Sequence, residues 1–315
     1  MPEPDPAAIR RFLQAHFEPG AAGVCQIGAG MFSRAYAFVA GRQSYVLRLN
    51  AWQEDLQKDA FAARHFSAPG LPIPPVLALG RYDEGRYYAI TARCPGQNLD
   101  RMGAGRVRPV VPRLFETLAV IHSTDVSAHR GWGLAGAAGR GRFQSWREAL
   151  EAFLNLKFQR TWRDLAGDTF LEADLYAAWL REMEDLLPYC PEDKYLVHGD
   201  FGFDNVLSDG RQITGVLDWA EYGLGDFIYD VAYLDFWSKE IPYGALWHEQ
   251  ATSLGRAVPH FEERMRCYML HIGLEGMRIA AAQGNEREYV RVRERTRSAL
   301  GPGRRSPTDW TQGSS

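Results

Sequence analysis

Short alternating runs of apolar and polar residues dominate the first third of the chain and predict β-strands. Two stretches have helical periodicity instead: one follows Asp5, a residue suited to cap a helix that starts at Pro6, and the other covers residues 52–66. Strands are expected near Val24 and in the segments 33–39, 44–49 and 76–93, the last divided in two by Asp83-Glu84-Gly85.

The pattern changes after Pro95-Gly96, which ends an apolar strand in a rigid turn and marks a boundary. Gly131 to Gly141 is rich in glycine and alanine and is expected to be a loop. From Gly301 onward the composition predicts a flexible tail. Helices are expected around 109–122, 144–160, 170–187, 227–237, 243–255 and 260–282.

One motif carries most of the chemical information in this chain. His198-Gly199-Asp200 is followed by Asn205, and Asp218 comes thirteen residues after the asparagine. Apolar residues flank the motif, an Asp-Gly turn follows, and residues 213–217 form a returning strand that delivers Asp218 to its end. The pattern predicts a hairpin that brings Asn205 and Asp218 to one ion.

These residue types suit metal-assisted phosphoryl transfer, in which the protein positions groups and neutralises charge. Asp200 would sit beside the acceptor hydroxyl, next to His198 of the same catalytic loop, while Asn205 and Asp218 would hold Mg²⁺. Two protein ligands suffice because Mg²⁺ keeps water and phosphate oxygens. The alternative is a polar loop whose side chains only satisfy one another. The complete spacing, the hairpin and the returning Asp favour catalysis.

The motif resembles the catalytic loop of protein kinases, with Gly199 in place of Arg and Asp218-Trp219-Ala220 in place of Asp-Phe-Gly. The His-Gly-Asp form, the Asp-Trp pair and Gly225–Ala232 resemble the aminoglycoside phosphotransferase family. The resemblance extends over nearly the whole chain, to about residue 285. The hygromycin B phosphotransferases are particularly similar in Tyr45–Arg48, Arg64–Phe66, Leu71–Pro74, Val197–Leu207 and Met269–Leu274.

The resemblance implies an α+β, bilobal, protein-kinase-like fold. Residues 1–94 would form a small, mostly antiparallel N-terminal lobe of about five strands that binds nucleotide. Residues 95–300 would form a larger, mostly helical lobe for catalysis and acceptor binding, and residues 301–315 the tail. The implied reaction moves the γ-phosphoryl group of ATP or GTP to a hydroxyl of an aminoglycoside. Hygromycin B is the leading candidate, and modifying it would give antibiotic resistance.

Three residues of the small lobe are candidates for phosphate binding. Gly28 and Gly30 let backbone amides approach a phosphate, and Ser33 adds a hydroxyl, although a Gly-x-Gly pair alone usually marks only a turn.

Arg48 and Asp59 stand where kinases place a lysine and its helical glutamate. Arg can still hold phosphate through its planar fork; the alternative is a surface ion pair. The resemblance places adenine at backbone groups of Ala92 and Cys94, with the Cys94 side chain packing beside the purine.

Acidic residues are concentrated between Asp200 and Glu240, where only Arg211 and Lys239 oppose nine carboxylates. Such a region attracts cations, so it favours Mg²⁺ and a polycationic acceptor; a solvated acidic face is the alternative. Asp226 and Asp230 are expected to cap a helix or brace the catalytic loop. The candidates for binding acceptor ammonium groups are Asp204, Glu221, Asp235 and Glu275.

Composition fits an ordinary globular enzyme: 315 residues, 46% hydrophobic, 24% charged, net charge −3. A net charge of −3 does not favour binding to nucleic acid. The four cysteines lack metal-ligand spacing, no secretory signal is visible, and no run of 18 apolar residues exists, so we expect a cytoplasmic monomer without a membrane segment. Two alternatives stay open: a kinase of another small hydroxyl compound (choline-like, homoserine-like or a macrolide), and a nucleotide-binding pseudokinase. Arg48 keeps the pseudokinase open, whereas Asp200, Asn205 and Asp218 argue against it.

Overall fold

The computed structural model describes residues 4–17, 20–30, 32–152, 160–238 and 240–301. Its tertiary contacts divide the chain into two compact units. Unit 1 comprises the described parts of residues 1–120, 136–139 and 204–220, and unit 2 those of residues 121–135, 140–203 and 221–315.

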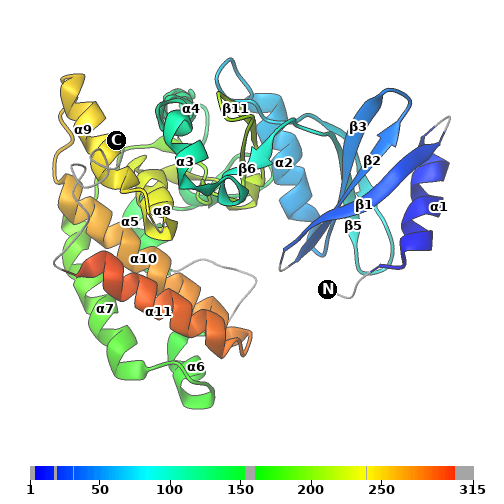
Figure 1. Cartoon of the computed structure of the whole chain (residues 1–315). Helices are drawn as coiled ribbons and strands as arrows, with labels where there is room; N and C mark the ends of the chain where they lie inside the picture. Colours follow the sequence, from blue (N-terminus) through cyan, green and yellow to red (C-terminus); the bar gives the residue numbers. More distant parts are fainter. Residues whose placement is uncertain (1–3, 18–19, 31, 153–159, 239, 302–315) are drawn as a thin grey trace. The chain divides into compact units, whose positions relative to one another are not determined.

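The main feature of unit 1 is a five-stranded antiparallel sheet (Figure 1). Its strand order is β1-β2-β3-β5-β4, with sequential hairpins joining the first three strands. This confirms the sheet expected from the alternating pattern. The strands are β1 (Ala21–Ala29), β2 (Ser33–Ala40), β3 (Gln43–Asn50), β4 (Val76–Arg81) and β5 (Tyr87–Ala92).

Strand β3 shows how the period of two assigns each face of this sheet its task. Leu47 and Leu49 are buried in a core cluster with Ile9 and Leu13 of helix α1 (Pro6–His16). The alternate residues Val46 and Arg48 line a pocket, and Arg48 contacts helix α2 (Gln53–His65).

Helix α1 begins as the sequence predicted. Pro6 occupies its first turn, and the Asp5 side chain accepts a hydrogen bond from the Ala7 N–H at 2.9 Å. His16, at its other end, packs against the rings of Phe12 and Tyr88.

The predicted hairpin is also part of unit 1. Strand β10 (Val206–Ser208) pairs antiparallel with β11 (Ile213–Val216) and, on its other side, with β6 (Gln97–Asn98). Along the chain, β6 is followed by η1 (Leu99–Arg101), α3 (Gly103–Val107) and η2 (Arg108–Val110). Helix α4 (Val111–Ser123) begins in unit 1 and ends in unit 2.

Unit 2 contains a four-stranded sheet in the order β8-β7-β12-β9. Its strands are β7 (Trp132–Ala135), β8 (Gly141–Phe143), β9 (Tyr195–Val197) and β12 (Gly223–Gly225). The loop expected at residues 131–141 was therefore wrong for β7 and for the start of β8. The glycines permit close strand approach: a Cβ at Gly131 would lie 2.2 Å from the Gly141 carbonyl oxygen.

Helix α10 (Phe261–Ala282) is the centre of the helical core, and it packs against α7 (Ala173–Leu186), α8 (Ile228–Trp237) and α11 (Glu286–Leu300) (Figure 1). The remaining helices are α5 (Trp146–Ala152), α6 (Trp162–Asp168) and α9 (Tyr243–Ser253), with short turns η3 (Leu187–Tyr189) and η4 (Trp219–Glu221). Part of the helix expected at 144–160 lies outside the described residues.

The sequence analysis missed α6 and α11. Helix α11 consists mostly of charged residues, and its buried stripe is short: Tyr289, Val292 and Thr296. Thr296 fits against a glycine, because a Cβ at Gly273 would lie 2.2 Å from its hydroxyl. The stripe has helical spacing, but it contains few apolar residues, so the segment as a whole is polar.

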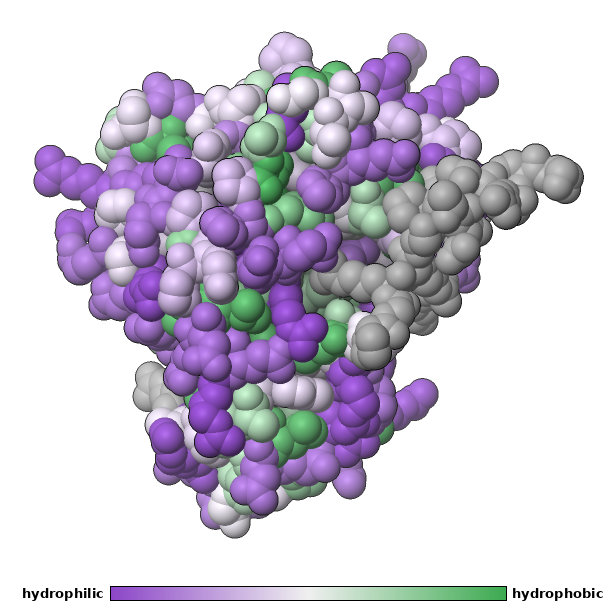
Figure 2. Space-filling model, turned by 90° about the vertical axis from the view of Figure 1, so that its left-hand side faces the viewer, coloured by the Kyte–Doolittle hydropathy of each residue, from purple (hydrophilic) through white to green (hydrophobic). Residues whose placement is uncertain are grey.

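The boundary expected after residue 94 does not coincide with the division of contacts, because residues 95–120 and the hairpin of residues 204–220 group with the five-stranded sheet. The two-lobe division at 94/95 stays a prediction, and the expected tail falls almost wholly outside the described residues. Within the described ranges, no helix is long and apolar enough to cross a membrane. The face drawn in Figure 2 is mostly hydrophilic, with small separate apolar patches.

Candidate functional site

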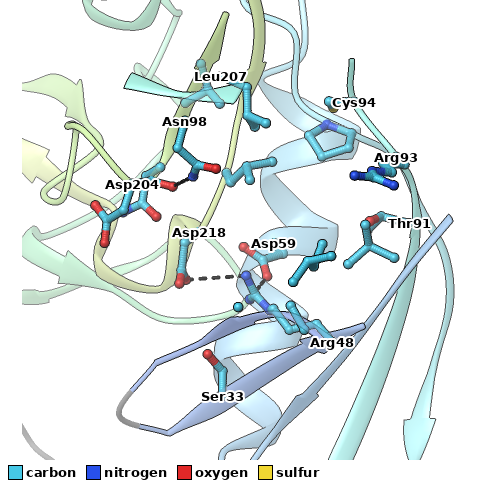
Figure 3. Close-up of a pocket in the computed structure, with 18 of the residues that line it drawn as sticks. Ser33, Arg48, Asp59, Thr91, Arg93, Cys94, Asn98, Asp204, Leu207 and Asp218 are labelled. Carbon is cyan, nitrogen blue, oxygen red and sulfur yellow. Dashed lines mark hydrogen bonds and ion pairs between the residues drawn. The ribbon is translucent and has the colours of Figure 1, made fainter. Parts of the chain in front are cut away.

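A pocket of about 920 Å³ lies in unit 1, and its size suits a small organic ligand (Figure 3). It is lined by both the five-stranded sheet and the β10–β11 hairpin. The structure thus brings together these predicted site residues: Gly28, Gly30, Ser33, Arg48, Asp59, Ala92, Cys94, Asp204, Asn205 and Asp218.

Arg48 is one of the cations that line this pocket, and its side chain lies beside Asp59 and Asp218 (Figure 3). Its guanidinium pairs with the Asp59 carboxylate, and Nη1 lies 3.6 Å from Oδ1 of Asp218. The Arg48 and Asp59 side chains are only 17% and 13% exposed. The alternative of a surface ion pair was therefore wrong, since this pair is largely shielded from solvent and links two elements of the pocket.

Asp218 adopts an unusual backbone conformation directly after β11. Its φ angle is 56°, in the left-handed region that few non-glycine residues occupy. The next residue, Trp219, is buried, and its N–H donates to Oδ1 of Asp59 at 2.8 Å. Asp59 therefore holds both Arg48 and the backbone that follows Asp218.

Asn205 and Asp218 occupy neighbouring ends of the hairpin. The Asn205 carbonyl accepts a hydrogen bond from the Leu217 N–H at 2.8 Å, and both side chains belong to residues that line the pocket. Among the described residues no group of three or more His, Cys, Asp or Glu is arranged to hold a metal ion. One amide oxygen and one carboxylate nevertheless fit Mg²⁺, which takes its other ligands from phosphate and water.

Asp204 is an acidic group of the same pocket. Its backbone carbonyl accepts a hydrogen bond from the Asn98 side chain (Figure 3). Although the residue keeps contact with solvent, burial by surrounding atoms raises the pKa of its carboxyl, and the charges of Asp100 and Asp218 raise it further. Asp204 therefore interacts electrostatically with two other carboxylates of the pocket, one of which is the metal-ligand candidate Asp218.

Strand β5 ends at Ala92, two residues before Cys94, so both predicted adenine-binding residues lie at this end of the strand. The Arg93 N–H between them donates to the Ser44 carbonyl at 2.9 Å, which fixes the strand end. Burial raises the pKa of the Cys94 thiol. This agrees with a packing role for the side chain, because a thiol with a raised pKa is a poor nucleophile.

Asp200 and His198 belong to unit 2, on the loop after β9. His198 is fully buried, and its Nδ1 accepts the Asp200 N–H at 3.2 Å. The buried Asp230 carboxylate accepts the N–H groups of His198 and Gly199 and bonds to Nε2 of His122 at 3.1 Å. Asp230 therefore braces this loop, as predicted.

Asp226 caps a helix, which was one of the two roles predicted for it. Its Oδ1 accepts the Ile228 N–H at 3.1 Å at the start of α8, and the same carboxylate binds Arg264 and Tyr268 in the buried core.

Two of the four predicted acceptor residues, Glu221 and Glu275, act electrostatically on the same buried tyrosine as Asp200 does. Burial raises the pKa of the Tyr229 hydroxyl, and the charges of Glu275, Glu221, Asp230 and Asp200 raise it further. Glu275 is also paired with Arg278 at 2.7 Å, so its charge is compensated.

The other two predicted acceptor residues are placed differently. Asp235 lies against α9, where a Cβ at Gly244 would be 3.0 Å from its Oδ2, and Asp204 belongs to unit 1. Tyr229, Asp100 and Lys58 were not among the predicted site residues; Lys58 lies between Gln57 and Asp59 in a polar part of α2, so no local signal marked it.

Sequence comparison defines the class of protein to which these features belong. Residues 23–259 match the model of the phosphotransferase enzyme family, and the chain belongs to this family. It is a phosphotransferase with the α+β, bilobal, kinase-like fold expected from the sequence.

Individual relatives narrow the comparison. Hygromycin-B 4-O-kinase of Escherichia coli is 32% identical over 327 residues, covering 99% of this chain and 93% of that protein. Aminoglycoside 3'-phosphotransferase of Escherichia coli is 39% identical over 54 residues, 17% of this chain and 20% of that protein.

Solved structures agree with the sequence relatives. A thermostable mutant of aminoglycoside phosphotransferase APH(4)-Ia, in ternary complex with AMP-PNP and hygromycin B, superposes with a TM-score of 0.82 at 30% identity. The match covers 93% of this chain and 97% of that one. A crystal structure of APH(4)-Ia gives a TM-score of 0.81 at 30% identity, covering 95% and 100% of the two chains.

Proposed function

We propose that this chain transfers the γ-phosphoryl group of ATP or GTP to a hydroxyl of hygromycin B and thereby confers resistance to it. The observation that carries the proposal is the 32% identity to hygromycin-B 4-O-kinase over 99% of this chain. The neighbouring structure with AMP-PNP and hygromycin B supports both the nucleotide and the acceptor class.

The pocket of unit 1 provides the nucleotide site in this proposal. The backbone around Gly28 and Gly30, the Ser33 hydroxyl and the Arg48 guanidinium bind the phosphates, and backbone groups near Ala92 and Cys94 bind the base. Asn205 and Asp218 hold Mg²⁺, which when bound neutralises charge on the phosphates. Asp59 keeps Arg48 and the Asp218 backbone in register through the contacts described above.

Asp200 accepts the proton of the acceptor hydroxyl in this proposal. The loop that holds it is fixed by His198 and Asp230. The fully buried His198 acts by orienting the Asp200 backbone, because its ring has no exposed surface from which to meet a substrate. Asp204, Glu221, Asp235 and Glu275 supply negative charge for the acceptor ammonium groups.

We place the activity of this enzyme in the cytoplasm, because that compartment contains both ATP and Mg²⁺. We also propose that the enzyme acts as a monomer. Expression in a susceptible bacterium should raise tolerance to hygromycin B. Purified protein with Mg²⁺ and either triphosphate should add one phosphoryl group to hygromycin B, detected by mass spectrometry. Phosphorylation of neutral or anionic alcohols with no transfer to any aminoglycoside would overturn the acceptor and leave the kinase activity standing.

A further inference from the structure

Lys58 is a buried lysine outside the residues that line the pocket. It lies on α2 directly before Asp59, is 3% exposed, and its Nζ donates to the carbonyl oxygen of Ala220. Removing an ammonium group from water is costly unless the group is hydrogen-bonded. The partner is the second residue after Asp218, so the buried charge serves the segment that follows this carboxylate.

Lys58 and Asp59 bind backbone groups of two consecutive residues of that segment. Asp59 accepts the Trp219 N–H at 2.8 Å, and Lys58 donates to the carbonyl of the next residue, Ala220. The two side chains, adjacent on one helix, thus fix one donor and one acceptor of the backbone. The Trp219 ring is buried, and its centroid lies 5.8 Å from that of the Phe66 ring. This packing limits movement of the segment further.

This fixation explains how Asp218 maintains its left-handed conformation. A non-glycine residue at φ 56° is strained, and such conformations persist where the surroundings determine the backbone on several sides. The contacts of Lys58 and Asp59 act immediately downstream of Asp218, and the β10–β11 pairing acts immediately upstream.

We propose that Lys58 is a positioning residue for phosphoryl transfer: it holds the Ala220 carbonyl so that the Asp218 carboxylate is presented to Mg²⁺. This inference rests on the proposed role of Asp218 as a metal ligand. Groups that orient a ligand without touching the metal are known to tune metal affinity strongly. Arg48 meets the same segment through Asp59, so α2 connects the phosphate-binding cation with the metal-binding carboxylate.

The test compares Lys58→Met with Lys194→Met in the full-length protein. Lys194 is a matched control because its Nζ also donates to a backbone carbonyl, that of His129 at 3.3 Å, and neither residue lines the pocket. Two properties are measured: amide hydrogen exchange of the peptide covering residues 217–221 without nucleotide or metal, and calorimetric binding of ADP with and without Mg²⁺.

We expect Lys58→Met to accelerate exchange at Trp219 and Ala220 while the rest of the hairpin keeps its protection. The gain in ADP affinity on adding Mg²⁺ should shrink about tenfold, with metal-free affinity unchanged. General damage would instead lower both affinities. Lys194→Met should change neither property. Wild-type exchange at 217–221 together with a wild-type Mg²⁺ gain would overturn the proposal.

A second variant covers the case in which Lys58→Met does not fold. Lys58→Gln keeps an N–H donor but loses the charge and shortens the side chain, and it should show the same two changes to a smaller extent; wild-type values in this variant would also overturn the proposal. Asp218→Ala, measured in parallel, separates the two hypotheses. If it retains the full Mg²⁺ gain, the metal assignment fails, whereas the exchange experiment still decides whether Lys58 holds the segment.

Discussion

The carboxylate of Asp230 accepts the backbone N–H of Gly199 at 2.9 Å, which ties the first turn of α8 to the loop that carries Asp200. Gly199 has a φ angle of +79°, and a Cβ there would lie 2.3 Å from the Glu221 carbonyl oxygen. A glycine is therefore required at this position for two reasons, its conformation and its close contact with another backbone.

Replacing Gly199 by Ala should destabilise the protein. The left-handed conformation and the contact with Glu221 together should reduce the free energy of unfolding by about 2 kcal/mol or more. Denaturant titration followed by circular dichroism measures this. Gly202→Ala is the control in the same loop, because nothing lies within 4 Å of a Cβ there and its φ is not positive. Equal losses in the two variants would contradict the argument.

Asp200→Asn should separate binding from chemistry. The amide cannot accept the hydroxyl proton, so kcat should fall about 10²- to 10⁴-fold, while the melting temperature and ADP affinity stay near wild type. Steady-state kinetics with hygromycin B gives kcat, and calorimetry gives the ADP affinity. Asp209→Asn is the matched control, since Asp209 is an exposed carboxylate of the hairpin turn that accepts the N–H groups of Arg211 and Gln212. A fully active Asp200→Asn enzyme would exclude Asp200 as the general base.

The parts of the site encoded by local sequence were predictable. The hairpin follows from its Asp-Gly turn and flanking apolar runs, so Asn205 and Asp218 were correctly expected at neighbouring ends. Arg48 and Asp59 were paired by resemblance, and their ion pair confirms that pairing.

Contacts between distant segments were not predictable in the same way. Lys58 binds a carbonyl 162 positions away, and no local pattern encodes that partner. The glycines of residues 131–141 suggested a loop, but several of them serve close strand packing, which only the folded chain reveals. Helix α11 was missed because its packing depends on a glycine of another helix, Gly273.

Arg48→Ala should impair binding of the triphosphate far more than binding of adenosine. The guanidinium is the group that would meet the phosphates, and its loss also leaves the Asp59 and Asp218 carboxylates without their shared cation. Arg48→Lys should recover only part of the affinity, because an ammonium cannot bridge both carboxylates as the planar fork does. Calorimetry with ATP, ADP and adenosine measures the difference. Equal losses for adenosine and ATP would indicate general damage to the sheet instead.

His271 should make stability depend on pH in a defined direction. Burial lowers its pKa to about 4, and its Nδ1 lies 3.2 Å from the Tyr229 hydroxyl. Between this value and the unfolded value of about 6.5, the unfolded state binds the proton and the folded state does not. The contribution of the neutral His271 to the free energy of unfolding is therefore fully present above about pH 6.5 and is lost as pH falls toward 4.

The measurement is the change in Tm between pH 7 and pH 5, which His271→Gln should make smaller than in the wild type even if its absolute Tm is lower. His16→Gln provides the control, because His16 is an exposed residue of α1. An unchanged pH dependence in His271→Gln would show that another group dominates acid destabilisation.

The predicted acceptor carboxylates should differ in their effect on KM for hygromycin B. Glu275 is paired with Arg278 and is 16% exposed, so Glu275→Gln removes a charge that is already compensated and leaves the arginine without its partner. The Glu221 backbone lies against the loop that carries Asp200, because a Cβ at Gly199 would lie 2.3 Å from the Glu221 carbonyl oxygen, so the Glu221 charge should act on a cationic acceptor held beside Asp200. Glu221→Gln should therefore raise the acceptor KM more than Glu275→Gln does, with the nucleotide KM unchanged in the Glu221 variant.

Because attraction between carboxylates and ammonium groups is screened over about 8–10 Å, the acceptor KM of the wild type should rise with salt concentration. The rise should be less steep in Glu221→Gln. Identical salt dependence in the wild type and Glu221→Gln would show that this carboxylate does not meet the acceptor.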